Sequence, residues 1–161
     1  MMILRTLTLL LAFCSLSAFR LEPTPPPVLE DWQVQMLEEV NALRARGCRC
    51  GRKRMPPAPP LRWSPKLAQA ARAHARDMNR HNYFSHQGRN GSSISDRVED
   101  TGYRWQAVGE NIAWNYSGVS AVVQGWRESP GHCRNMMSSS FTEMGAAIEG
   151  VYYVQDFGRP R

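Results

Sequence analysis

The spacing of apolar residues constrains this chain more than any other feature, because it changes from a helical period to an alternating one. Two long segments follow the helical period, with an apolar face that repeats every three or four residues. In the first segment this face consists of Trp32, Met36, Leu37, Val40 and Leu43. In the second it consists of Leu67, Ala71, His74 and Met78. We therefore predict a helix that ends at Gly47 and a second helix that starts after a Ser64 cap.

Near the C-terminus the apolar residues alternate, which is the period of a strand with one buried face. Residues 144–148 follow this pattern, Glu149-Gly150 has the composition of a turn, and residues 151–155 are rich in β-formers. We predict a terminal antiparallel hairpin over these residues.

Shorter elements fill the middle of the chain. We expect a short helix over residues 95–100, a strand near 109–114 and a helix that runs from Ser120 to Pro130. A new helical turn is expected over residues 129–137. Helices followed by strands in this order predict an α+β fold, in which helices flank a sheet.

The segment between the two long helices is rich in proline and in positive charge. Residues 52–60 contain four prolines, which exclude a helix and a central strand, so we predict a loop. Six cations fall within 11 residues: Arg44, Arg46, Arg49, Arg52, Lys53 and Arg54. No aromatic residue that could stack on a base is interleaved with them. We therefore favour a solvated surface over a patch for a cell-wall polyanion, and we expect no nucleic-acid partner.

Residues 1–18 have the organisation of a secretory signal peptide. Arg5 precedes an apolar run over residues 7–13, and small residues follow it. The run is shorter than the roughly 20 residues that span a bilayer, so we expect no transmembrane segment. A secreted protein, either extracellular or periplasmic, follows from this interpretation.

The signal peptide is followed by a spacer and a domain. Residues 19–28 are rich in proline and predict a stiff spacer, and residues 29–161 have the length of a single domain. Cys14 leaves a lipoprotein as an alternative, in which this cysteine is the lipidated first residue. Phe13 disfavours that alternative, because processing sites prefer small residues.

Three cysteines remain after removal of the signal, namely Cys48, Cys50 and Cys133. In an oxidising compartment this number predicts one disulfide and one free thiol. Cys48 and Cys50 are poor partners for each other, because we expect their alpha carbons about 7 Å apart and their side chains on opposite faces of an extended segment. Cys133 is therefore expected to bond to one of the two. A zinc site is the alternative, although no Cys-x2-Cys pair supports it.

Three short motifs follow one another at compact spacing: Asn82-Tyr83-Phe84-Ser85-His86, Gly109-Glu110-Asn111-Ile112-Ala113 and Ser129-Pro130-Gly131-His132. With these motifs, residues 32–158 resemble the CAP superfamily of cysteine-rich secretory, antigen 5 and pathogenesis-related 1 proteins. The chain looks most like its bacterial SCP-like extracellular branch. The resemblance implies a three-layer α-β-α sandwich with a mostly antiparallel central sheet, and it implies the disulfide Cys50–Cys133.

The resemblance also implies a cleft that carries two histidines and two glutamates. The motifs place three of these residues at His86, Glu110 and His132. The second family glutamate stands three residues after a helix tryptophan, whereas the glutamate after Trp126 in this chain, Glu128, lies one position early. One position is a rotation of about 100° on a helix, so Glu128 is the fourth candidate but can point away from the cleft.

Two imidazoles and one or two carboxylates can bind Zn²⁺ or another divalent cation, and His86 and His132 are the candidate metal ligands. A metal with an open position can activate water for hydrolysis. However, we find no nucleophile with a matched base. We therefore favour a monomeric, secreted binding module for a divalent cation, a lipid or another cell-envelope or extracellular ligand. The alternative is a metal-dependent hydrolase of peptide or cell-wall material, and a disulfide-stapled scaffold without a cleft function is the third interpretation.

Three of the polar residues also have structural alternatives. Glu110, together with Asn111, could bind loop amides and fix the start of the sheet. His132 could hold a helix terminus. His74 lies on the apolar face of the second helix, where we expect a hydrogen-bonded core residue and not a ligand.

Overall fold

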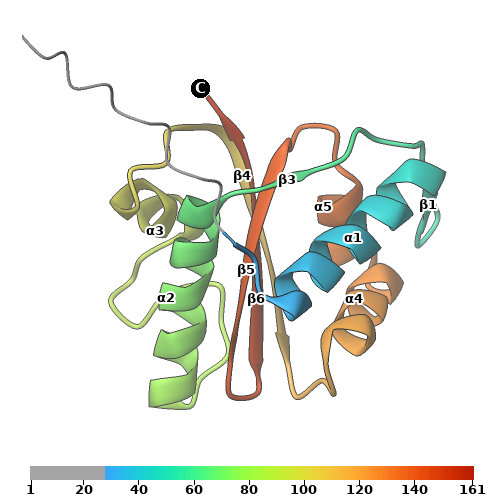
Figure 1. The fold of residues 1–161 in the computed structure, drawn as a ribbon. Helices are drawn as coiled ribbons and strands as arrows, with labels where there is room; N and C mark the ends of the chain where they lie inside the picture. Colours follow the sequence, from blue (N-terminus) through green and yellow to red (C-terminus); the bar gives the residue numbers. More distant parts are fainter. Residues whose placement is uncertain (1–27) are drawn as a thin grey trace, which may run out of the picture.

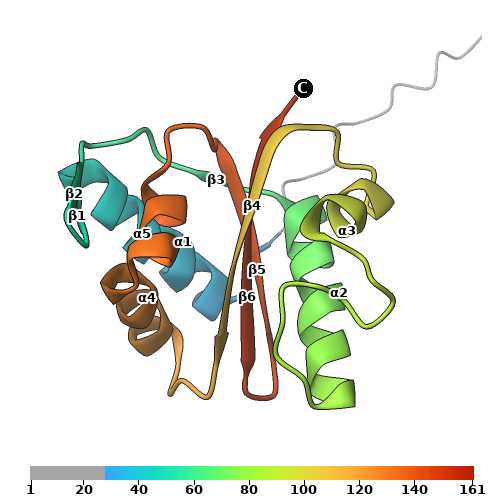
Figure 2. The ribbon, with the colours of Figure 1, turned by 180° about the vertical axis from the view of Figure 1, so that it is seen from behind.

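Helices lie on both faces of a central sheet in the computed structural model, which describes residues 28–161 (Figure 1). The predicted signal peptide, Cys14 and the spacer up to residue 27 lie outside the described residues. Helices α2 (Pro65–His81) and α3 (Ile94–Asp100) cover one face of the sheet. Helices α1 (Asp31–Arg46), α4 (Val119–Glu128) and α5 (Pro130–Met137) cover the other, as the reverse view also shows (Figure 2). The predicted three-layer α-β-α sandwich is confirmed.

The helix boundaries follow the signals in the sequence. Gly47 ends α1 with a φ of 69°, a backbone conformation that glycine adopts at little cost. The Ser64 side chain accepts a hydrogen bond from the Leu67 amide and so caps α2. Pro130 has no amide hydrogen to continue the hydrogen-bond ladder of α4, so the chain turns there and α5 begins.

The central sheet has the strand order β3-β5-β6-β4. Its strands are β3 (Arg62–Trp63), β4 (Trp105–Trp114), β5 (Glu143–Glu149) and β6 (Tyr152–Pro160). The pairs β5–β6 and β6–β4 are antiparallel, and β3 lies parallel to β5. The predicted terminal hairpin is therefore confirmed, and β4 forms an edge of the sheet.

Two expectations for the cationic segment are wrong. Residues 52–60 are not a loop throughout, because β2 (Lys53–Met55) pairs with β1 (Cys48–Cys50) in a small antiparallel sheet. The proline restriction applies only after Met55, so the chain can form a hairpin before it. Arg44 does not belong to the solvated surface: it is fully buried on α1, although the other five cations are exposed.

Arg44 holds α1 against the segment that follows α5. Its guanidinium donates hydrogen bonds to the carbonyls of Pro59, Met136 and Ser138 at 2.7, 2.7 and 2.9 Å, and to that of Phe141 at 3.4 Å. Burial lowers the pKa of Arg44 below its ordinary value. The cation is retained because backbone carbonyls replace the water that it loses.

The main core lies between the sheet and α1, α4 and α5. Its largest fully buried members include Trp126, Phe157, Met36 and Met144. On the other face, α2 packs very close to β5: a Cβ added at Gly145 would lie 2.1 Å from the Ala68 amide nitrogen. This close contact holds α2 against the sheet, and the loop that carries His86 starts at the end of α2.

Candidate functional site

The candidate site crosses the edge strand β4. Successive residues of a strand point to opposite faces, and the contacts of Glu110 and Asn111 show this alternation. Glu110 meets Arg97 of α3 on one face, while Asn111 donates to the carbonyl of His132 in α5 on the other. Two neighbouring residues of one strand therefore organise both sides of the site.

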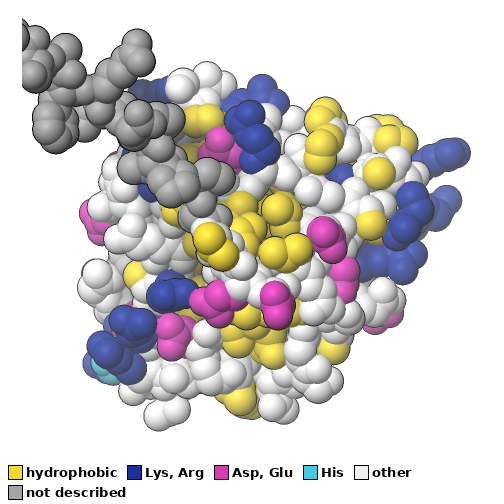
Figure 3. Space-filling view, viewed as in Figure 1, with side chains coloured by type: hydrophobic (Ala, Val, Ile, Leu, Met, Phe, Trp, Pro, Cys, Tyr) yellow, Lys and Arg dark blue, Asp and Glu magenta, His cyan; other side chains and the backbone are white. Residues whose placement is uncertain are grey.

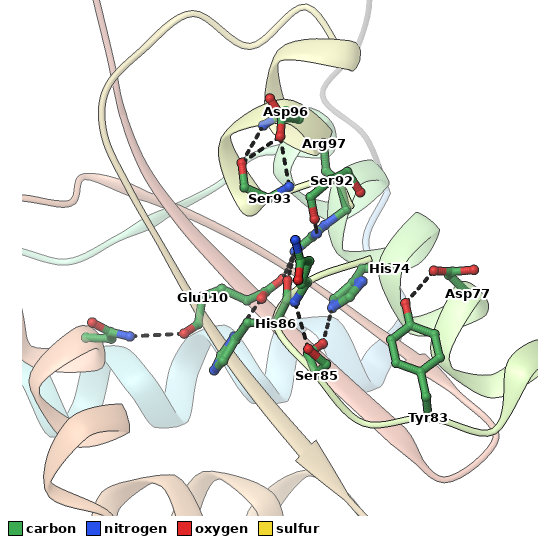
Figure 4. A network of polar contacts seen from close by, with 12 residues as sticks. His74, Asp77, Tyr83, Ser85, His86, Ser92, Ser93, Asp96, Arg97 and Glu110 are labelled. Atoms are coloured by element: carbon green, nitrogen blue, oxygen red, sulfur yellow. Dashed lines mark hydrogen bonds and ion pairs between the residues drawn. The ribbon is translucent and has the colours of Figure 1, made fainter. Parts of the chain in front are cut away.

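Glu110 lies between His86 and Arg97, as Figure 4 shows. One carboxylate oxygen accepts a hydrogen bond from His86 Nδ1 at 2.8 Å, and the other accepts one from Arg97 at 2.7 Å. Only 2% of the Glu110 side chain is exposed. Burial alone would raise the pKa of this carboxyl, but the His86 hydrogen bond and the Arg97 charge hold it below its ordinary value. Glu110 is therefore an ionised carboxylate with a donor on each oxygen.

The contact with Glu110 assigns the tautomer of His86. A carboxylate only accepts hydrogen bonds, so Nδ1 carries the proton and, in the neutral ring, Nε2 carries the lone pair. The His86 side chain is 58% exposed, which leaves this second nitrogen accessible to solvent. The pairing of a carboxylate with one histidine nitrogen is the arrangement that orients metal-binding histidines.

Hydrogen bonds from two other side chains fix the backbone of the loop that carries His86. His74 of α2 is buried and donates from Nε2 to the Ser85 carbonyl at 2.8 Å. Arg97 donates to the His86 carbonyl at 3.1 Å and to the Ser92 carbonyl at 3.0 Å. The prediction that His74 is a hydrogen-bonded core residue is confirmed, and its bond fixes the backbone next to His86.

His132 is positioned by amide side chains between α5 and the sheet. Asn111 donates to the His132 carbonyl at 3.2 Å, and Asn135 donates to the side-chain oxygen of Asn111 at 2.9 Å. Burial lowers the pKa of His132, and the charge of His86 lowers it further. At neutral pH His132 is therefore in the neutral form that binds metals.

The four sequence candidates do not contribute equally. Among the described residues, no hydrogen bond or ion pair joins Glu128 to the other three; it is exposed and accepts a hydrogen bond from Gln124 of its own helix at 2.6 Å. The ligand atoms of His86, Glu110 and His132 do not all lie within 4.8 Å of one another. His86 and Glu110 are in contact, whereas His132 lies on α5 in the opposite layer and is linked to β4 through its backbone carbonyl and Asn111.

Two residues that the sequence analysis missed are central to the site. Arg97 is the ion-pair partner of Glu110, and it falls on the apolar stripe of α3 between Ile94 and Val98. Asp156 lies opposite Glu110 in the β4–β6 register and is fully buried, and neither of its carboxylate oxygens has a hydrogen-bond partner among residues 28–161. Burial and the nearby charge of Glu110 raise the pKa of Asp156 well above its ordinary value. In the sequence, each of these charged residues stands where the periodic pattern of its element predicts a buried apolar residue. This mismatch was the signal for both.

The three remaining cysteines meet beside α5. The disulfide joins Cys50 to Cys133, which confirms the pairing implied by the family resemblance. Cys48 is free. The expectation that Cys48 and Cys50 point to opposite faces is wrong, because residues two apart in a strand share a face. Their sulfurs lie 3.8 Å apart.

Comparison with known proteins agrees with this architecture. Residues 37–157 match the cysteine-rich secretory protein family, CAP. The chain therefore belongs to the CAP family, as the three motifs indicate.

Two curated relatives come from Bacillus subtilis. The chain is 39% identical to the uncharacterized membrane protein YlbC of Bacillus subtilis over 97 residues, and 34% identical to its uncharacterized protein YkwD over 100 residues. These matches cover 60% and 61% of this chain but only 28% and 39% of the relatives. The chain thus spans well under half the length of these curated relatives.

Solved structures give the same fold. An extracellular protein containing a SCP domain from Bacillus anthracis superposes with a TM-score of 0.71 and 30% identity, covering 84% of this chain and 45% of that one. Venom allergen-like protein 4 of Schistosoma mansoni has a TM-score of 0.56 and 20% identity, covering 83% and 91% of the two chains, which is a likeness of fold alone. No helix within residues 28–161 is both long enough and apolar enough to cross a membrane.

Proposed function

We propose that this chain is a secreted binding module whose cleft at β4 holds a divalent cation, such as Zn²⁺, through His86 and His132. The observation that supports this most is the hydrogen bond between His86 Nδ1 and Glu110, which presents Nε2 outward as a ligand atom. His132 offers a second neutral imidazole. In this proposal Glu110 orients a ligand and does not itself bind the cation.

The ion pair of Arg97 with Glu110 bears on the kind of ligand. Because Arg97 neutralises the carboxylate, the two imidazoles offer a bound cation no opposite charge. The cation would therefore favour an anionic group in its remaining coordination positions. We propose a phosphate- or carboxylate-bearing component of the cell envelope as this ligand, in keeping with the formal net charge of +6 of the chain.

The contacts of Glu110 favour binding over hydrolysis. A general base needs an oxygen that can take a proton, with a pKa near the working pH. Both oxygens of Glu110 already accept hydrogen bonds, and its pKa is lowered. The alternative of a metal-dependent hydrolase therefore finds no base in this carboxylate.

Zinc titration by calorimetry, without reductant so that the disulfide remains closed, tests the proposal. We expect His86→Ala and His132→Ala each to weaken zinc binding by more than about tenfold, because even outer partners of a metal ligand have an effect of that size. The double variant should lose binding at this site. His81→Ala is the matched control, since His81 is exposed and contacts Asp77 on α2. Unchanged affinity in both single variants would contradict the proposal.

A further inference from the structure

Three sulfur atoms form a cluster between β1 and α5. The Cys48 thiol lies 3.6 Å from the sulfur of Cys133 and 3.8 Å from that of Cys50, and the latter two are bonded to each other. The two distances are nearly equal, so the thiol lies beside the disulfide bond. Cys48 and Cys50 share a face of β1, and both therefore point at the same residue of α5.

Solvent reaches these three sulfurs unequally. Cys50 and Cys133 are 1% and 0% exposed, whereas Cys48 is half-buried. Cys48 lines a hollow of about 560 Å³ together with Arg46, Arg49 and Arg54. In the space-filling view, basic side chains gather at the edge of the molecule where β1 and β2 lie (Figure 3). The thiol is thus the part of the cluster that solvent can reach.

We propose that Cys48 is an exchange thiol that moves the disulfide from Cys50–Cys133 to Cys48–Cys133. In this step Cys48 loses its proton to water and its sulfur attacks the sulfur of Cys133. The Cys50–Cys133 bond breaks, and the Cys50 sulfur leaves with the electron pair and takes up a proton. One disulfide and one thiol are present before and after, so no oxidant or reductant is consumed. The Cys48 side chain must first rotate toward the axis of the disulfide.

The two pairings close loops of similar length. Cys50 and Cys133 are 83 residues apart, and Cys48 and Cys133 are 85 apart. Loop-closure entropy therefore does not distinguish them. Burial raises the pKa of the Cys48 thiol, which Arg127 partly opposes. Because the thiolate is the attacking form, exchange is slow at neutral pH.

Exchange would change how α5 is tethered. Two residues of a strand span about 6.6–6.8 Å, so the point of attachment on β1 would shift by that distance. His132 immediately precedes Cys133 on α5. The pairing of the cysteines is therefore coupled to the position of a candidate cleft residue.

Mapping the free thiol tests the exchange directly in the unmodified chain. The protein is incubated at about pH 9, where a larger fraction of the Cys48 thiol is ionised than at neutral pH, then quenched in acid, denatured, labelled with N-ethylmaleimide and digested without reductant. We expect adducts at Cys48 and at Cys50, in a ratio that does not depend on protein concentration. Adducts at Cys48 alone, after any incubation time, would overturn the proposal, as would an adduct at Cys133 in place of Cys50. The Cys48→Ser control should carry no adduct at Cys50 or Cys133.

A second variant tests the new pairing by itself. Cys50→Ser removes one partner and leaves Cys48 and Cys133, whose sulfurs lie 3.6 Å apart. After refolding in a glutathione and glutathione-disulfide buffer, which supplies the oxidant, we expect no free thiol in these two positions and a Cys48–Cys133 peptide. Two free thiols in a folded variant would overturn the proposal. Neither measurement depends on cation binding, so each can fail independently of the proposed function.

Discussion

Replacing Glu110 with glutamine perturbs the central contact of the candidate site with little change in the shape of the side chain. The carboxylate accepts hydrogen bonds from two donors, His86 at 2.8 Å and Arg97 at 2.7 Å. Glutamine can accept from one of them through its carbonyl oxygen, and its NH₂ group then faces the other donor. In Glu110→Gln the Arg97 guanidinium also loses its counter-charge while it stays buried.

The magnitude follows from the exposure of the three side chains. Removing one member of a buried ion pair costs about 3–5 kcal/mol, whereas an exposed pair contributes about 0–1 kcal/mol. The side chains of Glu110 and Arg97 are 2% and 7% exposed, but that of His86 is 58% exposed. The Arg97 contact therefore dominates. We expect Glu110→Gln to lower the free energy of unfolding by about 3–5 kcal/mol.

Urea unfolding measures this change through the total tryptophan fluorescence, to which Trp126, 1% exposed in the folded state, contributes. Glu149→Gln is the matched control, because Glu149 pairs with Arg76 and the two side chains are 26% and 49% exposed. The control should lose less than about 1 kcal/mol. Equal destabilisation of the two variants would refute the reasoning that the buried Arg97 pair holds α3 to β4.

The same variant separates orientation from stability. At urea concentrations where Glu110→Gln remains folded, His86 keeps its ring but loses the carboxylate that fixes its tautomer. Loss of such an outer partner typically weakens metal binding by about 10–100-fold. We expect zinc affinity to fall within this range, as measured by competition with a chelating dye. An affinity equal to that of the unchanged chain would mean that Glu110 does not orient His86 for a cation.

Three further predictions concern the buried polar groups and the packing between layers. Arg44→Met leaves backbone carbonyls unpaired and should cost about 3 kcal/mol or more, whereas Arg46→Met on the exposed side of α1 should stay within about 0.5 kcal/mol in the same urea assay. Asp156→Asn should raise the thermal midpoint at pH 8. The pKa of Asp156 is raised in the folded state, so the wild-type chain loses stability as the pH rises from the ordinary pKa of 3.8 through the pKa of the folded state. This gain should vanish toward pH 4, and a gain independent of pH would contradict it. Gly145→Ala should cost about 3 kcal/mol or more, since its Cβ would meet the α2 backbone, and Gly131→Ala, with open space around it, should show no comparable loss.

The parts of the fold that could be predicted are those that short stretches of sequence determine. Ser64 and Pro65 define the start of α2, Gly47 the end of α1, and the alternation before Gly150 the hairpin of β5 and β6. Each of these signals acts within a few residues. The family resemblance added what local patterns cannot, which is the pairing of Cys50 with a cysteine 83 residues away.

The errors arose where long-range contacts override residue type. Arg44 was assigned to a solvated surface because of its charge, yet it lies four residues after Val40 on the buried stripe of α1 and reaches carbonyls up to 97 residues away. A strand over Lys53–Met55 was excluded by the prolines that follow it, although pairing with β1 ends before the first of them. In both cases the position along a periodic pattern was a better guide than the chemical character of the residue.

The candidate site shows the same limit from the functional side. His86, Glu110 and His132 could be found because motifs mark them. A motif does not reveal, however, whether the oxygens of a carboxylate already accept hydrogen bonds from other residues. Arg97 stands 11 residues after His86 and has no motif of its own, and its contact with Glu110 exists only once α3 packs against β4. That single contact changes the expected chemistry of the candidate site, since it makes a candidate base or ligand into a group that orients its neighbour. The role of an acid in such a site therefore has to be derived from its hydrogen-bond partners, and residue identity alone does not determine it.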